Sequence, residues 1–196
     1  MFAAFENAEW VGDPVDSVWD ATNGSLTLTA RAHTDWSNDS LSGNRMATSS
    51  ALAIARDGDF SLTARVEVGF ADTYDAGVLC LWLDENTWAK LCFEYSPQGQ
   101  PMVVSVVTRE FSDDVNSVPI DANAVHLRIS RIGDAYAFHS SQDGARWDFV
   151  RLFRLGDDRR ARVGLMAQAP VGEGCSVTFS EVEISTWTPA DLRSEE

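Results

Sequence analysis

The chain has 196 residues, of which 44% are hydrophobic and 23% are charged, and its formal net charge at pH 7 is -15. These proportions are typical of a globular protein and exclude a disordered or fibrous chain. The negative charge would repel nucleic acid phosphates and anionic membrane surfaces, so we expect neither nucleic acid nor a membrane as a partner. A chain of this length suits one large all-β domain.

The start of the chain and its cysteines indicate the compartment. The first ten residues, MFAAFENAEW, lack a basic stretch followed by an apolar one, and no apolar run approaches the roughly 20 residues that span a bilayer. Cys80, Cys92 and Cys175 have no metal-ligand spacing, and their odd number argues against a secreted disulfide framework. We therefore expect a cytoplasmic protein with buried free thiols.

Short segments of alternating apolar and polar residues recur between clusters of Gly, Asp, Asn and Pro, whereas helix signals are scarce. The clearest strand candidates are 25–33, 60–68, 76–84, 88–96, 102–110, 125–133, 135–142, 147–155, 162–169 and 175–185. The pairs Gly133-Asp134 and Asp143-Gly144 separate alternating runs as short hairpin loops do. The pattern predicts an all-β sandwich of two antiparallel sheets in one domain over residues 1–188. An acidic tail over residues 189–196 should be frayed.

The segment WAKLCFEY, residues 88–95, places a lysine and a glutamate inside an apolar run. Successive side chains of a strand point to opposite faces, which divides this segment into two sets. The core set is Leu91, Phe93 and Tyr95, and the opposite set is Trp88, Lys90, Cys92 and Glu94. Ionised side chains are costly to bury unless they are paired or face water. The second set therefore predicts a polar face with an aromatic ring and two opposite charges.

Several motifs follow one another from about residue 60 to residue 185. They are Asp75-Ala76-Gly77, Trp88 with Lys90 and Glu94, Val107-Thr108 with Ser112-Asp113, Ser141 with Asp143-Gly144 and Trp147, and Gly164 with Ala167 and Pro170. In these motifs the chain resembles the DUF1349 family, which implies a concanavalin A-like jelly-roll sandwich, related in fold to lectins and glucanases. Two positions depart from the family pattern: Ala169 replaces a serine before Pro170, and Asp114 replaces a frequent tryptophan.

The resemblance implies a curved sheet whose concave face forms a wet groove. A sugar ring offers apolar C–H patches to an aromatic face and hydroxyls to charged side chains. We therefore expect a lectin-like protein that binds a carbohydrate or related polar small molecule, with Trp88 stacking and Lys90 and Glu94 binding hydroxyls. The expected rim contacts are Thr108, Ser112 and Asp113. The alternative is that Lys90 and Glu94 form a structural network with their neighbours.

Two further candidates, His126 and Arg128, lie on the polar side of the strand at 125–133. They alternate with apolar residues that should face the core. We expect both to join the groove, because strands from this region often neighbour the central ones. The alternative for each is a solvated strand residue.

Catalytic and metal-binding motifs are absent from the sequence. Glucanases of this fold carry paired carboxylates as ExDxE or ExDxxE on one strand, and neither spacing occurs here. We assign no catalytic residue and no cofactor, and keep a glycoside-active enzyme using Glu94 and Lys90 as an alternative. The acidic residues between 72 and 85 lack an ordered calcium-loop pattern, so we predict no metal.

A third hypothesis is a protein-interaction module, in which the groove or a sheet edge docks a peptide or a second copy of the chain. Aromatic residues with arginine would then mark an interface. A monomer and a homodimer are both compatible with the sequence.

Overall fold

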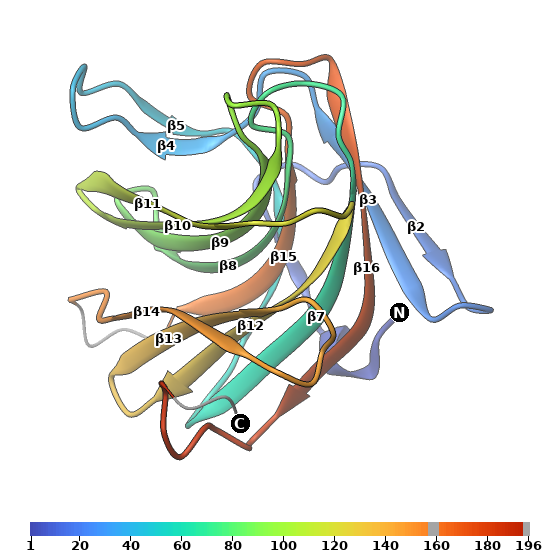
Figure 1. Cartoon of the computed structure of the whole chain (residues 1–196), viewed down its shortest axis with the longest axis vertical. Coiled ribbons are helices and arrows are strands. Elements are labelled where there is room, and N and C mark those ends of the chain that lie inside the picture. Colours follow the sequence, from blue (N-terminus) through green and yellow to red (C-terminus); the bar gives the residue numbers. More distant parts are fainter. Residues whose placement is uncertain (157–160, 194–196) are drawn as a thin grey trace.

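The structure, a computed structural model, describes residues 1–156 and 161–193. Two antiparallel sheets of seven strands each pack face to face, and a short hairpin lies on the outer side of one sheet (Figure 1). The helical content of the described part is a single 3-10 turn, η1 (Ala3–Phe5), and no helix there is long and apolar enough to cross a membrane. The predicted all-β jelly-roll sandwich is confirmed.

The first sheet contains the segment with the two charged side chains. Its strands, in spatial order, are β1 (Glu9–Val11), β6 (Ala51–Ala55), β15 (Arg162–Gln168), β8 (Ala76–Asp84), β9 (Thr87–Tyr95), β10 (Pro101–Arg109) and β11 (Phe111–Pro119). The four strands from β8 to β11 are consecutive in the chain, because short turns join each antiparallel pair. These strands bend toward the hairpin, so the outer face of the first sheet is concave (Figure 1).

The second sheet packs against the face of the first sheet that is opposite the hairpin. Its strands, in spatial order, are β14 (Asp148–Phe153), β13 (Ala135–Ser141), β12 (Ala124–Ile132), β7 (Phe60–Gly69), β16 (Gly174–Ser185), β3 (Ser25–Arg31) and β2 (Ser17–Asp20). After β16 the chain returns along this sheet, where His139 Nε2 lies 3.0 Å from the Leu192 carbonyl oxygen. Residues 194–196 of the predicted acidic tail lie outside the described residues.

The main core fills the space between the two sheets. Leu91 and Phe93 of β9 face it, as do Leu127 and Ile129 of β12, and all four are fully buried. The sheets approach closely at Gly77 on β8, where a Cβ atom would clash with valine side chains of the second sheet. Only glycine fits this position without displacing the opposite sheet.

A second apolar cluster covers the concave face of the first sheet. Trp88 and Cys92 of β9 belong to it, and Trp36 from the hairpin of β4 (Trp36–Asn38) and β5 (Arg45–Ala47) packs on them. This hairpin therefore acts as a third layer over one end of the concave face (Figure 1). All three cysteines are free and buried, as the sequence predicted.

All ten predicted strands are present, with ends that shift by at most one residue except in β3 and β14, which each end two residues early, at Arg31 and Phe153. The strands that the alternation did not reveal are β1, β2, β4, β5, β6 and β11. Most are short, and β11 is an edge strand with little buried surface, so its sequence lacks a regular alternation of apolar and polar residues.

Candidate ligand-binding cleft

Strand β9 presents Lys90 and Glu94 on the concave face of the first sheet, opposite Leu91 and Phe93. The sheet register extends this face to the neighbouring strands. Lys90 pairs with Val106 of β10, which pairs in turn with Asp114 of β11. An amine and a carboxylate from strands two apart therefore lie in one row across the sheet.

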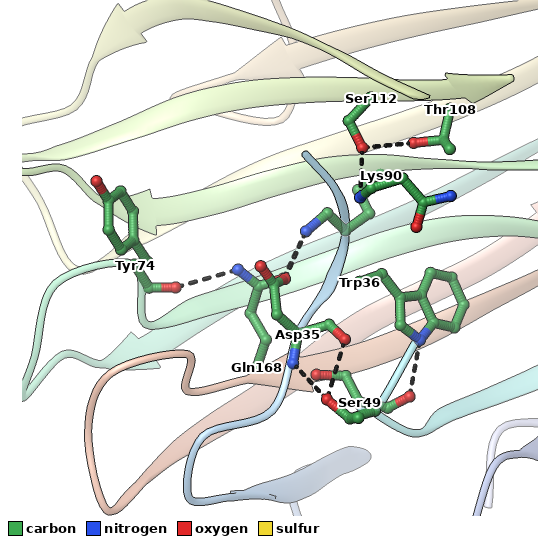
Figure 2. A network of polar contacts seen from close by, with 10 residues as sticks. Asp35, Trp36, Ser49, Tyr74, Lys90, Thr108, Ser112 and Gln168 are labelled. Atoms are coloured by element: carbon green, nitrogen blue, oxygen red, sulfur yellow. Dashed lines mark hydrogen bonds and ion pairs between the residues drawn. The ribbon is translucent and has the colours of Figure 1, made fainter. Parts of the chain in front are cut away.

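Lys90 is almost completely buried, and its ammonium group makes two hydrogen bonds within the protein. Its Nζ donates hydrogen bonds to Asp35 Oδ1 at 2.8 Å and to Gln168 Oε1 at 3.0 Å, and Gln168 Nε2 donates to the Tyr74 carbonyl at 3.1 Å (Figure 2). Burial is the largest single effect and lowers the pKa of Lys90, but Asp35, Cys92 and Glu94 together outweigh it and raise the pKa above the ordinary lysine value. Lys90 is therefore a permanent cation that ties Asp35 to β9 and β15.

The β4–β5 hairpin is held over the sheet by the indole of Trp36 and by a hydrogen bond from the backbone of Asn38. Trp36 is fully buried, its Nε1 donates to the Ser49 carbonyl at 2.8 Å, and its ring lies 4.5 Å from that of Trp82. The backbone N–H of Asn38 donates to Ser112 Oγ at 2.9 Å, and that hydroxyl is 2.9 Å from Thr108 Oγ1. Figure 2 shows the Trp36–Ser49 and Ser112–Thr108 hydrogen bonds on either side of Lys90.

Between the hairpin and strands β9 to β11 lies an open cleft of about 380 Å³, which we call the Lys90 cleft. Hydrogen-bonding side chains dominate its lining, chiefly Asp35, Glu94, Ser112, Asp114, Asn116 and Gln168. Since Lys90 is engaged with Asp35 and Gln168, the groups that face the open part of the cleft are mainly acceptors.

Glu94 has an unusual protonation equilibrium. Burial raises its pKa to about 7, and the positive charge of Lys90 opposes this rise only in part. Loss of solvent also raises the pKa of Asp114, although this residue remains exposed at the edge of the cleft. Near neutral pH, Glu94 can therefore act either as a hydrogen-bond donor or as an acceptor.

The predicted rim and stacking residues separate into three groups. Ser112 lines the cleft, while Thr108 is fully buried behind it. Asp113 points away from the cleft and pairs with Arg151 at 2.8 Å, because neighbouring residues of a strand face opposite sides. Trp88 is also fully buried, under the Trp36 ring at 5.8 Å, and so offers no surface on which a sugar could stack.

His126 and Arg128 do not belong to the Lys90 cleft, contrary to the expectation from sequence. They lie on β12 and face away from the core that Leu127 and Ile129 fill, which places them on the outer side of the second sheet. The alternation of β12 was read correctly, but the two sheets separate its polar face from that of β9.

Sequence reasoning missed several residues of the cleft. Gln168 had a detectable signal, because it ends the apolar strand β15 on the face opposite Val163 and Leu165. Asp35 had none, since it lies in a loop and reaches Lys90 only through the placement of the hairpin. Within the residues that the structure describes, no group of three potential metal ligands is present.

The DUF1349 family, described as a protein of unknown function, matches residues 10–187. The chain belongs to this family. A curated relative, "Regulation of enolase protein 1" of Saccharomyces cerevisiae, is 28% identical over 173 residues, which are 88% of this chain and 86% of the relative. The crystal structure of a functionally unknown protein from the same yeast has a TM-score of 0.85 at 26% identity, and the match covers 94% of this chain and 99% of that one.

More distant solved structures share the sandwich alone. A GH43 protein from Bacillus licheniformis has a TM-score of 0.71 at 14% identity, with 91% of this chain and 37% of that one covered. An alginate lyase from Klebsiella pneumoniae has a TM-score of 0.53 at 11% identity, with 89% and 85% covered. This DUF1349 protein therefore has a β-sandwich fold that also occurs in glycoside hydrolases and lyases, and its function does not follow from the fold.

Proposed function

We propose that this DUF1349 protein binds an uncharged, hydroxyl-rich small molecule, such as a carbohydrate, in the Lys90 cleft. The observation that carries the proposal is the engagement of Lys90 by Asp35 and Gln168, which leaves Glu94 and Asp114 to face a ligand. Hydroxyl groups donate hydrogen bonds to carboxylates, and these charge-assisted bonds are stronger than neutral ones.

The charge of the cleft favours a neutral ligand over an anionic one. Four carboxyl groups, on Asp35, Asp39, Glu94 and Asp114, line it beside a single buried ammonium. An anionic sugar would meet like charges at close range, which is costly in a partly desolvated site. The sandwich shared with glycoside hydrolases agrees with a carbohydrate ligand as a fold-level analogy.

Adjacent residues of β11 provide a matched test of this proposal. A glycan array would select a saccharide, and calorimetry would then compare wild type with Asp114→Asn and Asp113→Asn. Because Asp114 faces the cleft and Asp113 pairs with Arg151, the first variant should weaken binding by about fivefold or more and the second should not. Equal loss in both variants, or no saccharide bound by wild type, would refute the proposal.

A second candidate, a glycoside-active enzyme, is favoured by the raised pKa of Glu94. A carboxyl group that keeps its proton near neutral pH is suited to general acid catalysis. Lys90 is unsuited to act as a base, because Asp35 holds it protonated and shields it. Incubation of the selected saccharide with the protein, followed by mass spectrometry, separates the two functions: cleavage that is lost in Glu94→Gln identifies an enzyme, and an intact saccharide identifies a binding protein.

A further inference from the structure

Arg128 occupies the outer face of the second sheet and is only 2% exposed. Its Cζ atom lies 4.3 Å from the ring centroid of Trp147 and 5.3 Å from that of Trp187. Cation–π contacts of this kind use the faces of the guanidinium and the indoles. The N–H groups lie in the guanidinium plane and so remain available to other partners.

Two of these donors, Nε and Nη2, are buried and have no hydrogen-bond partner in the part of the chain that the structure describes. Burial lowers the pKa of Arg128 to about 10. Buried donors without an acceptor are rare and costly. Nε and the adjacent terminal nitrogen form one edge of the guanidinium, which matches the two oxygens of a carboxylate.

A cleft of about 420 Å³, which we call the Arg128 cleft, adjoins this arginine. Its walls include both tryptophans, the hydroxyl-bearing Thr63 and Ser185, and Glu183. Trp187 is 49% exposed whereas Trp147 is 8% exposed, so Trp187 is the less tightly packed of the two indoles. Because Nε and Nη2 are buried, an acceptor from outside can reach them only if part of this wall moves.

We propose that the Arg128 cleft binds a small hydroxylated carboxylate, whose carboxylate accepts hydrogen bonds from Nε and Nη2 of Arg128. Thr63 and Ser185 supply hydroxyl partners for the remainder of the ligand, and the indoles cover its apolar side. The two clefts lie on the outer faces of different sheets, so this proposal does not rest on the ligand of the Lys90 cleft.

Glu183 adds a negative charge to the Arg128 cleft. Glu183 pairs with Thr63, which pairs with Arg128, so the three residues form one row across β16, β7 and β12. The exposed Glu183 carboxylate lines the same cleft and so repels an incoming anion. Its neutralisation should therefore tighten carboxylate binding, whereas a neutral ligand would be insensitive to it.

The test is calorimetry on the full chain with D-glucuronate, with D-glucose as the uncharged counterpart and inorganic phosphate as a second oxyanion. Wild type should bind glucuronate in the millimolar range and glucose at least tenfold more weakly. Arg128→Lys, which keeps the charge but loses the planar edge, should weaken glucuronate binding about tenfold. Glu183→Gln should bind glucuronate about fivefold more tightly.

Arg131→Lys is the matched control, because Arg131 lies on the same strand but on the other face, where it donates to the Gly133 carbonyl. It should bind glucuronate as wild type does. Since Glu183 is exposed, Glu183→Gln should fold even if Arg128→Lys does not. The proposal fails if neither wild type nor Glu183→Gln binds glucuronate, if both arginine variants lose binding equally, or if phosphate binds as tightly with the same dependence on Arg128.

Discussion

Lys90 and Arg128 occupy equivalent places in the two sheets but have opposite surroundings. Each lies on a central strand, faces away from the main core and is almost fully buried, at 3% and 2% exposure. Lys90 has a carboxylate and an amide oxygen at hydrogen-bond distance. Arg128 has two indole rings, and two of its nitrogens have no acceptor among the residues described.

The difference shows that burial of a charge has two distinct uses. Where the chain supplies the counter-charge, the buried cation is part of the framework and holds another segment in place, as Lys90 holds the loop before the hairpin. Where aromatic rings remove solvent without supplying an acceptor, an anion that binds from outside gains the most binding free energy from the buried cation. The first arrangement shapes a cleft, and the second leaves donors for a ligand.

The largest effect is expected when the partner of Lys90 is removed. Asp35→Asn leaves a buried ammonium without a counter-charge and should lower the free energy of unfolding by about 3 kcal/mol. Chemical denaturation at pH 7 measures it. Asp13→Asn, which breaks an exposed pair with Arg31, is the control and should change nothing measurable. An equal change in the free energy of unfolding in the two variants would show that the Lys90–Asp35 pair stabilises the fold no more than an exposed pair does.

A rescue is expected when the lysine is removed as well. Lys90→Met in the Asp35→Asn background eliminates the unpaired charge and fills the same space, so it should recover about 2 kcal/mol of the loss. The same denaturation experiment measures the recovery in a double-mutant cycle. Additive losses would contradict a direct coupling between the two side chains.

A smaller effect is expected from pH. Because Glu94 has a pKa of about 7 in the folded protein against 4.5 as its ordinary value, the folded state binds more protons between these values. Stability should therefore fall as pH rises through this window, by about 1–2 kcal/mol after solvent screening. Glu94→Gln should flatten this part of the curve of unfolding free energy against pH. An unchanged slope would show that Glu94 titrates normally.

The smallest effect is expected at Arg128. Arg128→Met removes buried donors that have no acceptor and keeps the apolar contact with the indoles, so stability should stay constant or rise by about 1 kcal/mol. Thermal unfolding without added anions measures it. A loss as large as that of Asp35→Asn would mean that the protein itself satisfies this guanidinium.

Much of the fold could be predicted because the strands carry a local signal. In β7 and β12 alternate side chains are apolar, and the resulting faces agree with the structure. The same rule separated Lys90 and Glu94 from Leu91 and Phe93. It failed for β11, whose edge position leaves both faces largely exposed.

The candidate site was predictable only in part, because its residues come from segments far apart in the chain. Glu94 and Ser112 were identified from β9 and its following motif, whereas Asp35 comes from a loop with no periodic signal. Trp88 looked available for stacking until Trp36 was seen to cover it. Such a cover depends on a tertiary contact that no local pattern records.

The sequence by itself determined which side chains share a face, because alternation is a property of the extended backbone of one strand. Only the tertiary structure decided which sheet each face belongs to and what covers it, because strand order and hairpin placement depend on contacts between distant segments. Lys90 and Arg128 illustrate the division. Their polar faces were readable from the strands alone, but the carboxylate beside Lys90 and the two indoles beside Arg128 were not.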